Sequence, residues 1–188
     1  MKFAQEFLKN PVQIGSLFSS SKGLAKLITD SADLPTKSVI VELGPGTGVF
    51  TTEISNKKST SSLFFALELN DILFEVAKNK NPDLIIYNSS ASEINKYLLR
   101  HKVKYADCII SALPWAAFTD DLQEELLNEL YNALEPDGVF LTIALLPAMI
   151  SPSAIKFKKK LIKRFEKVFK SRIIWKNLPP AFVYICNK

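Results

Sequence analysis

Short apolar runs alternate with amphipathic segments over most of the chain. We expect strands at residues 39–43, 63–69, 84–87, 107–111 and 139–144. Between them, apolar residues recur at helical spacing over residues 50–57, 72–79, 93–100 and 121–134, and a further helix is expected at residues 22–32. Strands that alternate with helices in this way predict an α/β fold, a three-layer sandwich in which helices cover both faces of a mostly parallel sheet.

The pattern changes near the end of the chain. The apolar runs 173–175 and 181–186 are separated only by a short loop that holds Pro179 and Pro180. Two strands this close in sequence predict a hairpin, so a seven-stranded sheet should finish with an antiparallel strand. With 188 residues and 47% hydrophobic content, residues 1–188 are expected to form a single domain, with N-terminal helices, residues 1 to about 32, capping the site.

Closely spaced glycines follow the first predicted strand, in the run Gly44-Pro45-Gly46-Thr47-Gly48. Glycine at such a turn lets a ligand approach the backbone. A dinucleotide loop would carry its third glycine at Val49, and no P-loop lysine follows. The preceding Glu42 makes the loop acidic, which favours a cationic ligand with an amino acid tail, and S-adenosylmethionine fits that description. Glu68, at the tip of the second strand, is placed to accept ribose hydroxyls. The alternative for the glycine run is an ordinary tight turn between a strand and a helix.

Positive charge is concentrated at the end of the sequence. Residues 156–188 hold 11 of the 24 lysines and arginines, but only one of the 19 acidic residues. Within this region, residues 156–170 have the pattern of a basic amphipathic helix. It either covers the sheet with a solvated outer face or attracts an anionic phospholipid membrane, and nucleic acid would be attracted as well. The candidate membrane residues are Phe3, Phe7, Lys156, Lys158, Lys159, Lys160, Lys163 and Arg164.

Other features exclude some classes of protein. Cys108 and Cys186 lie in apolar runs typical of buried strands, and His101 has no neighbouring ligand residues, so we expect neither a disulfide nor a metal site. The sequence contains no apolar run of about eighteen residues that would span a bilayer. The first residues lack the apolar core of a signal peptide. We therefore expect a cytoplasmic protein, which would be peripheral at the inner face of the membrane where its basic helix attracts anionic lipid.

The loop after the fourth predicted strand carries the candidate chemistry. Parallel strands place their following loops at one edge of the sheet, so this loop should lie beside the glycines. It is similar to the Asn/Asp-Pro-Pro-Tyr motif of amino-group methyltransferases, in which the leading residue holds a conjugated amine. Ser111 at that position is a weak acceptor, which favours an alkylamine. The candidate pocket residues are Ser111, Leu113, Pro114, Trp115 and Tyr184. Trp115 is either a cation–π partner or a core anchor, and Tyr184 either lines the pocket or packs in a strand.

Four segments together resemble a known family. Residues 14–21, 42–51, 111–118 and 177–184 resemble the bacterial phospholipid N-methyltransferases, class I S-adenosylmethionine-dependent enzymes related to the ribosomal RNA adenine dimethyltransferases. The resemblance implies stepwise methylation of phosphatidylethanolamine toward phosphatidylcholine, with S-adenosylhomocysteine as the second product. It implies that the cofactor contacts Gly15, Ser20, Glu42, Gly44, Pro45, Gly46, Thr47, Gly48, Glu68, Leu69, Ser90, Ala91, Ser111 and Ala112.

The sequence departs from that family at several positions. Ser90 stands where the family carries an aspartate that reads the adenine amino group, and Ala112 replaces a glycine. A tyrosine that commonly follows the fifth strand is missing. Two alternatives therefore stay open: a methyltransferase acting on ribosomal RNA adenine or a small amine, and a non-enzymatic, membrane-associated protein that binds S-adenosylmethionine.

Overall fold

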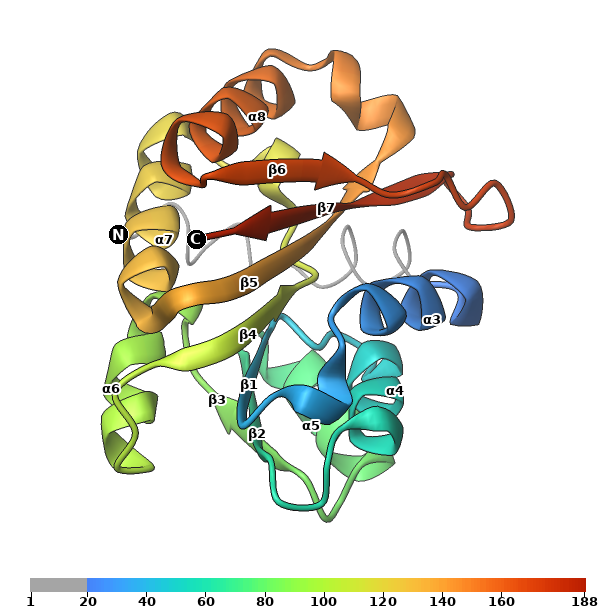
Figure 1. Cartoon of the computed structure of the whole chain (residues 1–188). Coiled ribbons are helices and arrows are strands. Elements are labelled where there is room, and N and C mark those ends of the chain that lie inside the picture. Colours follow the sequence, from blue (N-terminus) through green and yellow to red (C-terminus); the bar gives the residue numbers. More distant parts are fainter. Residues whose placement is uncertain (1–19) are drawn as a thin grey trace.

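The computed structural model describes residues 20–188, which form a twisted sheet covered by helices on both faces (Figure 1). The seven strands of this part of the chain are arranged in the order β3-β2-β1-β4-β5-β7-β6. Their bounds are β1 Val39–Leu43, β2 Leu63–Glu68, β3 Ile85–Asn88, β4 Ala106–Ser111, β5 Leu134–Leu145, β6 Lys167–Lys170 and β7 Ala181–Asn187. Strands β1 to β5 pair in parallel and β7 pairs antiparallel to β5. The predicted fold class is confirmed.

Four of the six α-helices in the described part of the chain begin at a side chain that caps a free backbone N–H group. The α-helices are α3 Lys22–Ser31, α4 Val49–Lys57, α5 Asp71–Lys80, α6 Ile94–Arg100, α7 Asp120–Ala133 and α8 Pro152–Arg164, with 3₁₀ turns η1 Leu34–Thr36, η2 Ala91–Glu93, η3 Trp115–Ala117 and η4 Leu146–Ile150. Ser21, Asn70, Thr119 and Ser151 each accept a hydrogen bond from a backbone N–H in the first turn of the helix that follows. These local signals explain why the predicted helix starts lie within a few residues of the observed ones.

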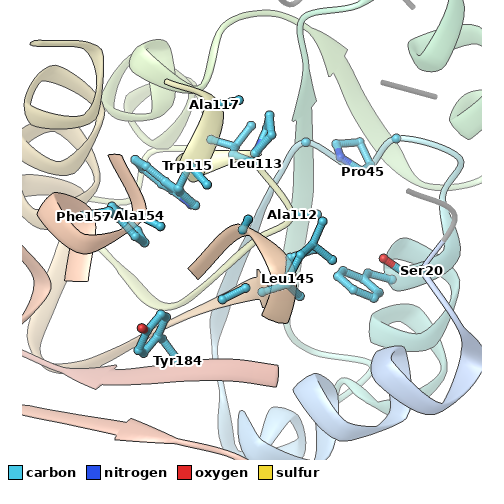
Figure 2. A pocket seen from close by; sticks show the side chains of 18 of the residues that line it. Ser20, Pro45, Ala112, Leu113, Trp115, Ala117, Leu145, Ala154, Phe157 and Tyr184 are labelled. Carbon is cyan, nitrogen blue, oxygen red and sulfur yellow. The ribbon is translucent and has the colours of Figure 1, made fainter. Parts of the chain in front are cut away.

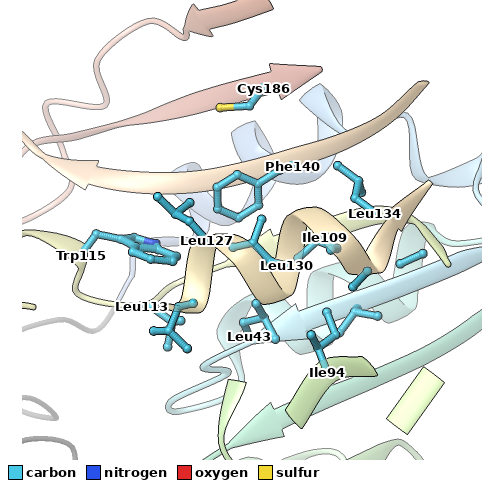
Figure 3. Close-up of a cluster of buried hydrophobic side chains, with 14 of the residues drawn as sticks. Leu43, Ile94, Ile109, Leu113, Trp115, Leu127, Leu130, Leu134, Phe140 and Cys186 are labelled. Atoms are coloured by element: carbon cyan, nitrogen blue, oxygen red, sulfur yellow. The ribbon is translucent and has the colours of Figure 1, made fainter. Parts of the chain in front are cut away.

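Two apolar layers hold the helices on the sheet. On one face, side chains of α6, α7 and α8 pack against Leu43, Ile109 and Phe140 (Figure 3). On the other face, α3 and α4 bury Leu24, Ile28 and Ile54. Both cysteines are fully buried in these layers and neither forms a disulfide, as the sequence indicates. The layers leave the carboxyl ends of β1, β4 and β5 free to carry the site.

The end of the chain differs from its predicted course in two ways. The basic helix stops at Arg164, and residues 167–170 form edge strand β6 instead of extending the helix to residue 170. The hairpin partner of β7 is β6, whereas Ile174 makes only an isolated bridge with Ala181. The prediction that residues 173–175 form that strand is therefore wrong. The physical reason is that β6 is short and largely exposed, so its apolar pattern is too weak to be distinguished from a helical one.

Residues 1–19 lie outside the part of the chain that the structure describes. The predictions for Phe3, Phe7 and Gly15, and for helices before residue 20, therefore stay predictions. Among residues 20–188, none of the helices has both the length and the apolar character needed to span a membrane.

Candidate functional site

A cavity of about 350 Å³ opens at the carboxyl edge of the sheet (Figure 2). At one end it is lined by Gly44, Pro45, Gly46 and Thr47 of the loop after β1, with Glu68 beside them. At the other end it is lined by aromatic and aliphatic residues from η3, η4, α8 and β7. The described lining is Ser20, Gly44, Pro45, Gly46, Thr47, Val49, Phe50, Glu68, Asn70, Leu73, Ala112, Leu113, Pro114, Trp115, Ala116, Ala117, Ile143, Ala144, Leu145, Ala148, Met149, Ser151, Ala154, Phe157 and Tyr184.

The glycine loop is shaped by its backbone and by one carboxylate. Gly44 and Gly46 have positive φ angles of 74° and 56°, a region that side chains rarely adopt. A Cβ at Gly44 would lie 2.9 Å from Leu113, whereas a Cβ at Gly46 would meet nothing within 4 Å. The Gly46 N–H donates to Glu68 Oε2 at 2.9 Å and the Asn70 N–H donates to Glu68 Oε1 at 3.0 Å. Glu68 therefore fixes the loop beside open space, as a cradle for a ligand requires.

Glu42 lies beneath the loop with its carboxyl group fully buried. Its two oxygens and the nearby Thr51 hydroxyl have no hydrogen-bond partner among residues 20–188. Burial raises the pKa of Glu42 to about 8, and the charge of Glu68 adds to the effect, whereas Thr51 opposes it. A buried, unpartnered acid is costly to ionise. Glu42 does not itself line the cavity, but a cationic group bound at the loop above it would favour its ionised form.

Ser111 ends β4 and orients the loop that follows. Its Oγ accepts hydrogen bonds from the Leu113 N–H at 3.3 Å and from Trp115 Nε1 at 3.2 Å. Trp115 stacks on Phe157 of α8 with ring centroids 4.6 Å apart, and only 3% of its surface is exposed. Trp115 is thus a core anchor that also lines the cavity. The Ser111 hydroxyl is occupied in holding this loop.

Tyr184 closes the apolar end of the cavity from β7. Figure 2 shows it near Phe157 and Ala154, below them in this view. The ring is 1% exposed, and its hydroxyl has no hydrogen-bond partner in the described part of the chain. Burial raises the pKa of Tyr184 to about 12, so the phenol keeps its proton at neutral pH. The Tyr184 ring lines this end of the cavity, while its hydroxyl oxygen is buried in the wall.

The structure brings most of the predicted site residues together, but not all of them. Those that line the cavity are Ser20, Gly44, Pro45, Gly46, Thr47, Glu68, Ala112, Leu113, Pro114, Trp115 and Tyr184; those that do not are Glu42, Gly48, Leu69, Ser90, Ala91 and Ser111. Gly48 packs against α5, since a Cβ there would lie 2.7 Å from Asn81. The Ser90 hydroxyl caps η2 by accepting from the Ser92 N–H.

Several lining residues carry no local sequence signal of a site. Phe157 and Met149 come from α8 and η4, far along the chain from the glycine loop. The helical spacing of Phe157 indicates only that it faces the core. Its contact with Trp115 depends on how α8 folds back over η3, which periodicity does not specify.

Three of the predicted membrane residues on α8 are engaged in ion pairs with α7. Lys160 lies 3.0 Å from Asp120, Lys156 lies 3.8 Å from Asp120, and Arg164 pairs with Glu124. Lys158, Lys159 and Lys163 form no ion pair with any residue from 20 to 188. They lie on the side of α8 that also exposes Ile155 and Ile162.

No group of three or more histidine, cysteine, aspartate or glutamate side chains in the described part of the chain is placed to hold a metal ion. The site consists of a glycine cradle, the buried carboxyl groups of Glu68 and Glu42, and an aromatic wall. That donor set suits an organic ligand that carries hydroxyl and ammonium groups.

Several solved structures with the same fold are methyltransferases. The structure matches precorrin-6y C5,15-methyltransferase from Geobacter metallireducens with a TM-score of 0.68 at 15% identity, covering 92% of each chain. It matches an O-methyltransferase from Bacillus cereus in complex with S-adenosylhomocysteine with a TM-score of 0.66 at 14% identity, covering 97% of this chain and 91% of the other. At these identities the likeness shows the shared fold.

Sequence comparisons identify the methyltransferase family to which the chain belongs. The chain is 26% identical to ornithine lipid N-methyltransferase from Singulisphaera acidiphila, over 98% of this chain and 94% of the relative. The family model for ribosomal RNA adenine dimethylase matches residues 2–168. The resemblance deduced from the four sequence segments is confirmed. The chain therefore belongs to the ribosomal RNA adenine dimethylase family and is an S-adenosylmethionine-dependent methyltransferase.

Proposed function

We propose that this enzyme methylates the amine of a phospholipid or aminolipid headgroup, with phosphatidylethanolamine as its substrate. The observation that carries the proposal is the state of Ser111. An aromatic amine needs a hydrogen-bond acceptor to localise its lone pair, but the Ser111 hydroxyl already accepts two N–H groups. An aliphatic amine has no such requirement. Ornithine lipid, which the name of the Singulisphaera relative gives as its substrate, also carries an aliphatic amine.

The residues at the glycine end fit S-adenosylmethionine. Gly46 faces open space, so the ligand can approach its backbone. In this proposal Glu68 shares its oxygens between the Gly46 N–H and the ribose hydroxyls. Glu42 is a buried acid without a hydrogen-bond partner among residues 20–188, and a nearby ammonium group would stabilise its ionised form. When bound, the cofactor supplies an electrophilic methyl group. Leu69, Ser90 and Ala91 lie at the ends of β2 and β3, where an adenine ring would be read.

The apolar end of the cavity would position the headgroup amine. An alkylammonium has a pKa near that of lysine, so forming the free amine at pH 7 costs about 4 kcal/mol. Holding the reacting groups in near-attack geometry supplies roughly 7 to 11 kcal/mol. In this proposal Trp115, Phe157 and Leu113 exclude water, and the Tyr184 oxygen accepts a hydrogen bond from the amine when substrate enters the cavity. Tyr184 keeps its own proton, so water or another weak base takes the proton that the amine loses.

We expect Tyr184→Phe to lower kcat about 10-fold, because one orienting hydrogen bond to the amine is lost. The KM for S-adenosylmethionine should not change. Since the hydroxyl has no partner in the described structure, its removal should leave the melting temperature unchanged or slightly higher. Steady-state kinetics and thermal unfolding measure both. A kcat equal to that of the native enzyme would remove Tyr184 from the substrate site.

We further propose that the enzyme acts peripherally on an anionic membrane, at the cytoplasmic face, with the outer side of α8 in contact with lipid. Replacing Lys158 and Lys159 by glutamine should weaken binding to vesicles of phosphatidylglycerol and phosphatidylethanolamine about 30-fold, at roughly 1 kcal/mol for each charge. The matched control replaces Lys102 and Lys104, which are exposed in the turn before β4. Equal vesicle binding by the test and control variants in sedimentation would assign α8 a purely structural role.

A methyltransferase acting on ribosomal RNA is the alternative function, and the name of the matching family favours it.

The identity of the lipid is tested by incubating the enzyme and S-adenosylmethionine with vesicles that contain either phosphatidylethanolamine or ornithine lipid. Mass spectrometry of the extracted lipids should show methylated phosphatidylethanolamine. If only ornithine lipid is methylated, the proposed substrate is wrong but its class, an aminolipid, is right. If neither lipid is methylated, the proposal is contradicted.

A further inference from the structure

An exposed apolar tip stands out on the loop between β6 and β7, residues 171–180, which we call the rim loop. Trp175 is 67% exposed and Leu178 is 81% exposed. In Figure 1 this loop projects from the sheet on the side where α3 lies. Single exposed apolar residues are common, whereas large apolar side chains that gather in one place mark an interaction surface.

The rim loop is held in one conformation by a buried residue between these two side chains. Asn177 is 3% exposed, its Nδ2 donates to the Pro179 carbonyl at 2.7 Å, and its Oδ1 accepts from the Ser21 N–H at 2.9 Å. The Ile174 N–H donates to the Ala181 carbonyl at 2.7 Å. The outward direction of Trp175 and Leu178 is therefore built into the fold, and little conformational entropy remains to be lost when they bind something.

The rim loop also borders the site. Asn177 is bonded to Ser21, which follows the cavity residue Ser20, and the Pro180 carbonyl accepts from the Leu146 N–H at 2.8 Å, next to the cavity residue Leu145. On the η4 side, Ile150 is 87% exposed and lies between Met149 and Ser151, which both line the cavity. A partner that contacts Trp175, Leu178 and Ile150 would therefore lie at the edge of the cavity.

The charges of the rim loop indicate an anionic partner. Arg172 and Lys176 are exposed beside the apolar tips and form no ion pair within residues 20–188. The sequence has no acidic residue after Glu166. Tryptophan with flanking basic residues is typical of segments that lie at the interface of a bilayer. RNA would use the tryptophan and the charges, but it offers no apolar environment for Leu178 and Ile150.

From these observations we propose that the rim loop inserts Trp175 and Leu178 into the interface of an anionic phospholipid bilayer and so seats the cavity at headgroup depth. This inference rests on the proposed lipid substrate. It assigns membrane insertion to a surface separate from the basic side of α8. Charges on α8 attract the enzyme to the membrane, whereas the rim loop sets its depth and orientation.

The emission of Trp175 provides the test, because the other tryptophan, Trp115, is buried. Without S-adenosylmethionine, addition of phosphatidylglycerol and phosphatidylethanolamine vesicles should shift the emission to the blue, and brominated acyl chains should quench it. Trp175→Phe should abolish both changes. Replacing Trp175 and Leu178 together by alanine should weaken vesicle binding about 30-fold, whereas Leu99→Ala, an equally exposed leucine on α6, should leave it unchanged.

Unaltered emission on vesicle binding, equal binding by the double variant, or a response of Trp175 to RNA but not to vesicles would each overturn the inference. Because methyl transfer takes no part in these measurements, their outcome is independent of the proposed activity. If insertion fails while phosphatidylethanolamine in detergent micelles is still methylated, the inference falls and the proposed function stands. If the rim loop inserts but no lipid is methylated, the inference stands and the proposed function falls.

Discussion

Replacing Glu68 by alanine is expected to weaken the binding of S-adenosylhomocysteine on the order of 100-fold, because two effects coincide. The variant loses the carboxylate that is placed to accept the ribose hydroxyls. It also leaves the Gly46 and Asn70 N–H groups without the oxygens that now accept them at 2.9 and 3.0 Å. The glycine loop then no longer holds the shape that the ligand needs.

Titration calorimetry measures this loss, and two variants serve as controls. Glu68→Gln keeps one amide oxygen as an acceptor and should lie between the native protein and the alanine variant. Glu75→Ala removes the same charge from an exposed position on nearby α5 and should bind normally. Native affinity in Glu68→Ala would exclude Glu68 from the cofactor site.

Glu42→Gln is expected to move stability and affinity in opposite directions. The pKa of Glu42 is raised from its ordinary value of 4.5 to about 8 in the folded protein. Its stabilising contribution is fully present below pH 4.5 and is lost as the pH rises through 8, because the carboxyl group ionises near pH 4.5 in the unfolded chain but only near pH 8 when it is buried. Glutamine is never charged, so the variant keeps this contribution at every pH.

At pH 9 the variant should therefore be more stable than the native protein by on the order of 4 kcal/mol, or roughly 10 °C in melting temperature. Near pH 5 the two proteins should melt together. S-adenosylhomocysteine should bind the variant about 10-fold more weakly, since the buried acid beneath the loop no longer attracts its ammonium group. Thermal unfolding between pH 5 and 9, together with calorimetry, measures both. A variant that is less stable at pH 9 would mean that Glu42 is paired in the folded protein.

The parts of the fold and site that sequence predicted are those with local signals. Strand β1, the glycines and Glu42 are adjacent in the chain, and Glu68 ends an apolar run, so their meeting at one edge follows from parallel pairing. Helix α7 has its own cap at Thr119. These features need no knowledge of distant contacts.

Other parts depend on contacts between distant segments. Edge strand β6 is set by pairing with β7, not by its own weak pattern. Phe157 reaches the cavity because α8 packs on η3, and the side chains of Lys160 and Arg164 turn toward α7 because Asp120 and Glu124 lie there. The role of Ser111 in holding Trp115 is visible only when both side chains are placed.

The proposed lipid substrate requires that the apolar end of the cavity receive a lipid amine and not an RNA base. The most direct measurement is a competition in one reaction, in which the enzyme meets phosphatidylethanolamine vesicles, ribosomal RNA and S-adenosylmethionine radiolabelled in its methyl group. Extraction into organic solvent separates the two acceptors. We predict that the label enters the lipid fraction. Label in the RNA alone would contradict this account.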